Sequence, residues 1–336
     1  MMMLRFTVWV YFLGLFSQAS PLFGQACCSG GVPASGNLGL GSQGKGVFQL
    51  QATYDYNQLL DLLDGSQKLE DRTRTRTTHA LLLEASYDFH PRFGVNGLFS
   101  WIRQERLIET LPGQSDFTSN QGIGDAILLF RYNLLVPNAA QTGPALSVGL
   151  GPKIPLGASD RANSQGIVLP ADLQPGTGAW DAMFWSQIAH TLGKHPNWSL
   201  AGFSTYRLTS TNQRFNGQQA YRFGNEWLLQ AGMSHRWLLR KWLMDTGLNL
   251  QYRNLTPDQV ERLPFENTGG QWLHLRPLIN WNLSPTRSIR LMGDIPLYRN
   301  LQGTQLTTSY RVTATVYLAL GQSSNLDSPF SNRIPR

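Results

Sequence analysis

The last patterned stretch of the chain, residues 310–320, alternates between apolar and polar positions. A period of two with many β-branched and aromatic residues is typical of a strand between two unlike environments. About eleven residues is also the length that a tilted strand needs to cross a bilayer. The stretch therefore predicts the closing strand of an outer-membrane β-barrel. One face carries Tyr310, Val312, Ala314, Val316, Leu318 and Leu320, and the other carries Arg311, Thr313, Thr315, Tyr317 and Ala319.

The same alternation recurs from residue 48 onward. It predicts an all-β fold, a closed antiparallel transmembrane barrel of about twelve strands, an even number as in single-chain bacterial barrels. The alternating runs fall within residues 48–57, 81–89, 93–101, 125–132, 146–153, 180–188, 198–208, 226–236, 242–253, 273–281, 289–297 and 310–320.

The connections between these runs alternate in length. Long polar ones span residues 58–73, 107–121, 156–177, 209–221 and 254–270, whereas residues 90–92, 191–197, 237–241 and 283–286 form short ones. Residues 133–144 are intermediate. Long outer loops and short periplasmic turns are expected of a barrel whose N-terminus lies in the periplasm.

Several aromatic residues lie beside the short connections, where a periplasmic interfacial girdle is expected. The alternative is that aromatic residues simply favour strands. The residues concerned are Tyr87, Phe89, Phe93, Trp198, Trp242 and Trp281.

Composition agrees with a barrel. Charged residues make up 15 % of the 336-residue chain, below the roughly 25 % of ordinary globular proteins. The mean hydropathy of −0.24 excludes a polytopic helical membrane protein and suits strands with one polar face. The net charge of +7 comes from scattered Lys and Arg, without a nucleic-acid-binding motif, so we expect no nucleic-acid partner.

The N-terminus resembles a secretory signal peptide. Arg5 precedes an apolar core at residues 6–16, and small residues allow cleavage after Ala26; the apolar core is too short for a comfortable transmembrane anchor. We therefore expect a signal peptide at 1–26, a flexible Gly/Ser-rich segment at 27–46, the barrel at 47–320 and a polar tail at 321–336.

The two cysteines, Cys27 and Cys28, directly follow the expected cleavage site. Neighbouring cysteines seldom bridge each other because the geometry is strained. The preferred interpretation is either that the two cysteines have no special role in the N-terminal segment or that they form an intermolecular disulfide. Lipidation of Cys27 and binding of a soft metal ion by the pair are the alternatives.

A set of motifs from Gly122 onward resembles a family of outer-membrane "transporter" proteins associated with phenol meta-cleavage degradation. The matching pieces are residues 122–125 (GIGD), 149–157 (GLGPKIPLG), 173–181 (LQPGTGAWD), 269–272 (GGQW) and 295–310 (IPLYRNLQGTQLTTSY). The resemblance implies a β-barrel channel for small hydrophobic or aromatic compounds. The chain departs from the family at Leu320, where members often end on an aromatic residue.

No catalytic constellation occurs among the six histidines, and no HExxH or phosphate-loop motif in a fitting context. We expect no enzyme activity and no cofactor. The alternating Arg72, Arg74 and Arg76 are expected at the outer rim, where they would attract anions or merely be solvated. Charges of both signs are expected on the lumen face, as a salt-bridge lattice or as determinants of selectivity. The lumen-lining set is Glu84, Asp125, Arg131, Asp181, Arg207, Glu226, Asp245, Arg276, Arg290, Asp294 and Arg311.

The sequence thus predicts a porin-like channel in the outer membrane of a Gram-negative bacterium, for passive passage of small solutes. Its expected partners are outer-membrane lipids, a small-molecule solute and the barrel-assembly machinery. The alternatives are a closed structural barrel and, less favoured, a barrel lipase or protease.

Overall fold

The computed structural model describes residues 40–111, 114–136, 143–192, 195–240 and 242–321. The expected signal peptide at 1–26, Cys27, Cys28 and the tail from residue 322 lie outside the described residues. In the described part no helix is long and apolar enough to cross a membrane.

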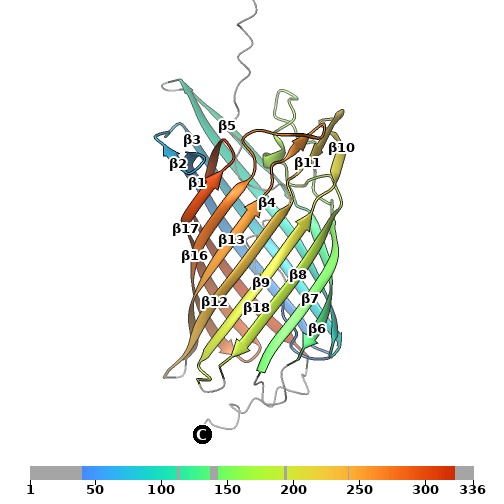
Figure 1. Cartoon of the computed structure of the whole chain (residues 1–336), viewed down its shortest axis with the longest axis vertical. Coiled ribbons are helices and arrows are strands. Elements are labelled where there is room, and N and C mark those ends of the chain that lie inside the picture. Colours follow the sequence, from blue (N-terminus) through green and yellow to red (C-terminus); the bar gives the residue numbers. More distant parts are fainter. Residues whose placement is uncertain (1–39, 112–113, 137–142, 193–194, 241, 322–336) are drawn as a thin grey trace, which may run out of the picture.

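Within these residues, twelve long antiparallel strands form one closed barrel, so the predicted fold class is confirmed (Figure 1). The first and last strands close it, with Phe48 opposite Leu320 and Tyr56 opposite Val312. The strands are β1 (Phe48–Asp64), β3 (Arg74–His90), β4 (Phe93–Leu111), β6 (Ala126–Leu135), β7 (Gly143–Ile154), β8 (Asp181–Thr191), β9 (Trp198–Leu208), β12 (Glu226–Leu239), β13 (Trp242–Leu255), β16 (Gly270–Ser284), β17 (Arg287–Leu301) and β18 (Thr304–Leu320).

The two faces of the strands differ as the alternation predicts. In β18 the Val316 side chain is 56 % exposed, whereas the neighbouring Thr315 is 8 % exposed. Exposed apolar residues continue around the outside and form a belt that suits lipid contact. Members of this belt include Leu83, Phe99, Phe130, Leu150, Phe184, Leu248 and Leu291.

The aromatic residues beside the short turns lie on the outside of the barrel. Phe89 stacks on Phe93, with ring centroids 6.4 Å apart, and Phe93 contacts Tyr132 at 5.0 Å. Phe89 and Phe93 flank the short turn between β3 and β4, and the short turns gather at one end of the barrel (Figure 1). An interfacial girdle is expected at such an end.

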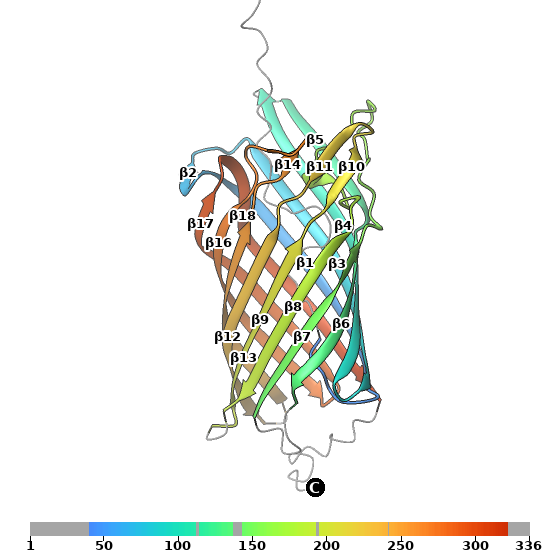
Figure 2. The ribbon, with the colours of Figure 1, turned by 45° about the vertical axis from the view of Figure 1, so that its right-hand side comes forward.

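The other end of the barrel carries more secondary structure than predicted (Figure 2). β5 (Gln114–Ile123) pairs with the outer part of β4, so residues 107–111 and 114–121 form paired strands where a loop was expected. A second, small sheet joins β10 (Thr211–Phe215), β11 (Gln219–Arg222), β14 (Gln259–Val260) and β15 (Leu263–Pro264). β2 (Gln67–Leu69) folds back on β1, and η1 (Ala171–Leu173) is a 3₁₀ turn. We call this end the outer end.

Candidate functional site

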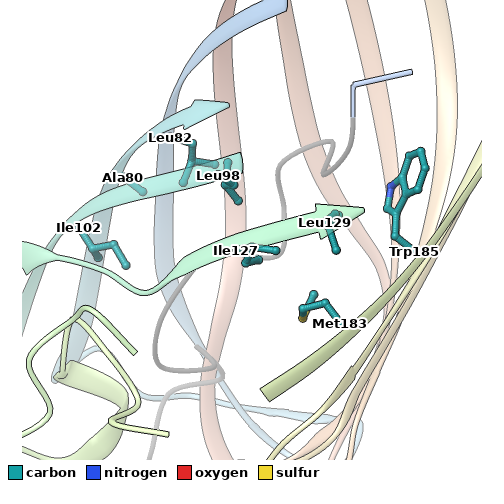
Figure 3. Close-up of a cluster of buried hydrophobic side chains, with 8 residues drawn as sticks. All are labelled: Ala80, Leu82, Leu98, Ile102, Ile127, Leu129, Met183 and Trp185. Atoms are coloured by element: carbon teal, nitrogen blue, oxygen red, sulfur yellow. The ribbon is translucent and has the colours of Figure 1, made fainter. Parts of the chain in front are cut away.

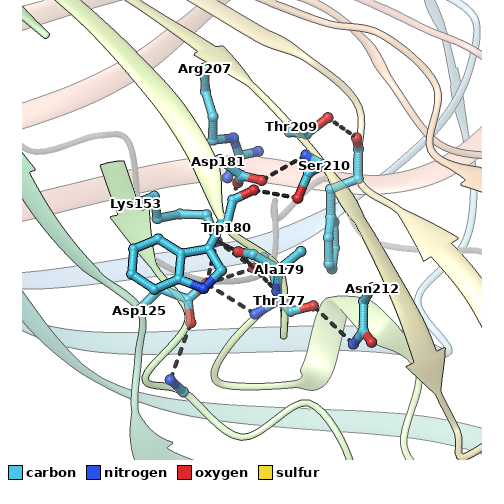
Figure 4. A network of polar contacts seen from close by, with 12 residues as sticks. Asp125, Lys153, Thr177, Ala179, Trp180, Asp181, Arg207, Thr209, Ser210 and Asn212 are labelled. Atoms are coloured by element: carbon cyan, nitrogen blue, oxygen red, sulfur yellow. Dashed lines mark hydrogen bonds and ion pairs between the residues drawn. The ribbon is translucent and has the colours of Figure 1, made fainter. Parts of the chain in front are cut away.

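Asp125 organises a buried polar network at the outer end (Figure 4). It precedes β6 and accepts hydrogen bonds from the Lys153 ammonium at 2.6 Å, the Thr177 amide at 3.0 Å and the Gly157 amide at 3.1 Å. Lys153 also lies 3.2 Å from Asp181. The ionic side chains are almost fully buried, a state that is stable only when charges are paired. The network therefore anchors the loop between β7 and β8.

The same loop crosses itself closely through two glycines. A Cβ on Gly157 would lie 2.6 Å from the Gly176 Cα, closer than any side chain permits. A Cβ on Gly124 would likewise lie 3.3 Å from the Pro175 carbonyl oxygen. The motif pieces 122–125, 149–157 and 173–181 therefore meet at one place, which the sequence alone did not show.

A second ion pair holds η1 inside the outer mouth of the barrel. Arg76 forms a 2.6 Å ion pair with Asp172 and also donates to Gln104. Asn120 of β5 donates to the Leu173 carbonyl at 2.9 Å. Arg76 is 1 % exposed, so it is not the solvated rim residue that the sequence predicted. Its partner lies 96 residues away, beyond the reach of a local pattern.

A third cluster links neighbouring strands below the small outer sheet. Glu226 lies 3.2 Å from Arg207 and 2.6 Å from Arg253. The Arg253 guanidinium also stacks 4.9 Å from the Trp272 ring, a cation–π arrangement.

Midway along the barrel, charges of both signs pair across β16, β17, β18 and β1. Asp294 contacts the His274 imidazole and lies 3.5 Å from Arg276. Arg311 lies 3.7 Å from Asp55. A lattice of this kind braces the wall, and it also presents fixed charge to any solute that passes.

At the periplasmic end, residues 40–46 lie against the inner wall of the barrel. Glu84 accepts a 2.7 Å hydrogen bond from the Leu40 amide, and Arg131 donates to the Leu40 carbonyl. Asp88 pairs with Arg131 and accepts from the Gln43 amide at 3.0 Å. The sequence predicts a flexible segment here, but these contacts fix its last residues.

Part of the inner wall is apolar rather than polar. Eight buried residues from β3, β4, β6 and β8 form an apolar strip on the inward face (Figure 3). Sequence reasoning missed most of it because it expected the inward positions to be polar. The apolar strip consists of Ala80, Leu82, Leu98, Ile102, Ile127, Leu129, Met183 and Trp185.

A cavity of about 400 Å³ occupies the periplasmic half of the barrel. Side chains from β1, β8, β9, β12, β13, β16, β17 and β18 line it, together with Leu40 and Gly41. Two of its lining residues are charged. Asp245 forms a two-pronged contact with Arg236, at 2.7 and 3.3 Å. Arg290 forms no such pair with any residue that the structure describes, and its Nε is buried. The predicted lumen residues thus fall into several clusters, and their role in selecting solutes stays a prediction.

The small outer sheet covers a buried carboxyl group. Asp258 accepts hydrogen bonds from the Tyr221 hydroxyl at 2.5 Å and the Gly224 amide at 2.8 Å. Burial raises the pKa of Asp258 to about 6, although these hydrogen bonds and Arg207 act in the opposite direction. Burial also raises the pKa of Tyr221, with Asp258 contributing.

No group of three or more His, Cys, Asp or Glu side chains suited to a metal ion occurs in the part of the chain that the structure describes. The predicted pair Cys27 and Cys28 falls outside that part.

Comparison with known proteins identifies the family. A family model described as "Putative MetA-pathway of phenol degradation" matches residues 92–315, well over half of the chain. The chain belongs to this family. A search of curated proteins found no significant match.

Solved structures with the same fold include the COG4313 outer membrane channel from Pseudomonas putida F1. It is 12 % identical, with a TM-score of 0.64, and the alignment covers 83 % of this chain and 97 % of that one. The transport unit of the Escherichia coli autotransporter AIDA-I is 10 % identical, with a TM-score of 0.48 over 85 % and 94 % of the two chains. The P. putida toluene transporter TodX is 9 % identical, with a TM-score of 0.37 over 84 % and 91 %. The likeness to the COG4313 channel shows that this chain has the fold of an outer-membrane β-barrel of Gram-negative bacteria.

Proposed function

We propose that the protein is an outer-membrane channel for passive passage of small solutes, among them hydrophobic or aromatic compounds. The observation that carries the proposal is the cavity of about 400 Å³ inside a closed barrel. A barrel of about eight strands can fill its interior with side chains, whereas sixteen or more leave an aqueous pore. This barrel lies between the two, and its interior is only partly filled.

The apolar strip supports the assignment of hydrophobic solutes. Trp185 and Met183 extend along β8 towards Gln187, which lines the cavity. Small-molecule sites combine an apolar surface with a few polar groups, and this junction of strip and cavity offers both. The COG4313 protein of P. putida F1, which shares this fold, is an outer membrane channel.

We further propose that the protein acts without covalent chemistry and reaches the membrane through the barrel-assembly machinery. A hydrolase would need a nucleophile beside a base. In the described residues no serine hydroxyl is hydrogen-bonded to a histidine ring; His274 contacts Asp294 and His79 contacts Tyr54.

Conductance of the purified full-length protein in planar bilayers, together with swelling of proteoliposomes in arabinose, tests the channel function. We expect discrete conductance steps and arabinose-driven swelling. The buried ion pairs and the anchored residues 40–46 favour the alternative of a closed structural barrel. Such a barrel would show no conductance steps in planar bilayers and no swelling of proteoliposomes in arabinose.

Replacing part of the apolar strip tests the solute class. Leu82→Asn and Leu129→Asn place amides on the strip, and we expect slower uptake of toluene with arabinose swelling unchanged. An equal loss for both solutes would argue against a separate hydrophobic route.

A further inference from the structure

Among the residues that the structure describes, Arg290 differs from the other predicted lumen charges because no hydrogen-bond or ion-pair partner lies beside its guanidinium. It lies on β17, in register with Asn280 of β16 and Thr315 of β18. In the part of the chain that the structure describes, no group accepts a hydrogen bond from its guanidinium or pairs with it, and its Nε is buried. A guanidinium carries five donors, and leaving it unpaired away from bulk water costs free energy.

The carboxylate that acts electrostatically on Arg290 is Asp245, but Asp245 is already satisfied. It receives two hydrogen bonds from Arg236, one from Asn282 at 2.8 Å and one from Asn280 at 3.4 Å. Asp245 and Arg236 therefore form a neutral pair, and among the described residues no second carboxylate compensates the positive charge of Arg290.

Arg290 faces the cavity in the periplasmic half of the barrel. The cavity wall also offers polar groups, among them Ser288 and Gln51, and apolar surface at Leu278 and Phe203. A volume of about 400 Å³ falls within the range of pockets that bind small molecules. The site thus joins one cation to apolar walls.

We propose that this cavity binds the carboxylate of a small organic acid, with Arg290 as its anchor. The planar guanidinium matches a carboxylate through two parallel hydrogen bonds. One unpaired cation suits a monoanion, and the apolar walls suit an organic body rather than an inorganic ion. The proposal deepens the channel function and rests on it, since the acid reaches the cavity through the barrel.

Benzoate and its neutral isostere benzamide are the probes for the purified full-length protein in detergent, with binding measured by equilibrium dialysis. We expect benzoate to bind saturably and more tightly than benzamide. Arg290→Gln should weaken benzoate binding by about 10- to 100-fold, the range for a charged hydrogen-bonded contact, and leave benzamide unchanged. Arg290→Lys keeps the positive charge but lacks the two parallel donors of the guanidinium, so its affinity for benzoate should lie between those of the wild type and Arg290→Gln.

Arg287→Gln is the matched control, because Arg287 is an exposed residue at the start of the same strand and its loss changes the net charge equally. Equal effects of Arg287→Gln and Arg290→Gln would overturn the site. So would benzoate displacement by chloride at equal concentration, which would mark an inorganic-anion site. Folding is checked by the heat-dependent gel mobility of each variant, and Arg290→Gln should be at least as stable as the wild type because it removes an unpaired charge.

Dialysis and swelling separate this proposal from the channel function. If the wild-type protein binds benzoate but gives no arabinose swelling, the proposed channel function is refuted and the proposed carboxylate site stands. If arabinose swelling is normal but benzoate binds no more tightly than benzamide, the channel function stands and the carboxylate site is refuted.

Discussion

Thr177 donates both its backbone amide, at 3.0 Å, and its hydroxyl, at 2.7 Å, to the same oxygen of Asp125, although 52 residues separate the two in sequence. The contact ties the long loop between β7 and β8 to the rim of the barrel. Lys153 completes the arrangement by forming ion pairs with both Asp125 and Asp181. Outer-loop position and barrel stability therefore depend on the same few buried charges.

Removal of the Lys153 ammonium should destabilise the barrel strongly. Lys153→Met leaves two buried carboxylates without their cation, which typically costs about 3–5 kcal/mol. The free energy of unfolding in urea, measured in detergent micelles by tryptophan fluorescence, checks this. Lys68→Met is the control, because Lys68 is 60 % exposed in its pair with Asp61 and such pairs contribute about 0–1 kcal/mol. Similar losses for both variants would contradict the role given to the network.

The barrel itself was predictable because each strand carries its own signal. Val316 and Thr315 alternate between lipid and interior, and the alternation can be recognised one strand at a time. The β4–β5 hairpin carries no such signal, because residues such as Ser115 and Asp116 lie in the part of the chain where both faces meet water. The lengths of the connections indicate which end of the barrel is the outer one, but they do not indicate that β4 and β5 continue as paired strands at that end.

The interior was less predictable for a different reason. That charged residues would alternate along the strands is a local property, but the partner of Arg76 or Asp125 depends on how distant loops fold. The sequence gives equally little sign that Arg290 has no ion-pair partner among the residues that the structure describes. Trp185 did leave a signal, since it occupies the same strand face as Asp181 and Gln187, where the pattern otherwise predicts polar residues.

Val316→Arg should destabilise the barrel because Val316 faces lipid near the middle of the outward apolar run 310–320 of β18. Arginine at the bilayer midplane of a barrel costs about 2–4 kcal/mol. Ala201→Arg is a better inward control than Thr315→Arg, since Ala201 lines the cavity, whereas the Thr315 hydroxyl lies 3.0 Å from that of Thr53. Unfolding in lipid vesicles measures both, and equal losses would refute the assignment of the two faces.

The small outer sheet should loosen as pH rises. Burial raises the pKa of Asp258 from 3.8 to about 6, so the folded state holds a proton that the unfolded segment releases. The stabilisation is fully present below pH 4 and is lost as pH rises through about 6. The facing groups Tyr221, Arg207 and Asp172 are included in this balance.

Hydrogen exchange of the backbone amides of β11 and β14, corrected for the intrinsic pH dependence of exchange, measures this loosening. Protection should fall by up to about 100-fold between pH 4 and pH 7, since each pKa unit is a factor of ten. Asp258→Asn stays neutral throughout and should flatten the profile. A wild-type profile that rises with pH, or one that the variant reproduces, would exclude Asp258 as the cause.

Gly157→Ala should displace the loop between β7 and β8. The new Cβ would lie 2.6 Å from the Gly176 Cα, so one backbone segment has to move, at a cost of about 1–3 kcal/mol typical of overpacking. We expect faster proteolysis within residues 155–180 and a larger single-channel conductance, because the loop is anchored across the outer mouth. Gly97→Ala is the control: its Cβ would meet no atom closer than 3.9 Å, and both properties should stay at the wild-type level. A Gly157→Ala variant with wild-type proteolysis and conductance would show that the close crossing of the two glycines does not position the loop.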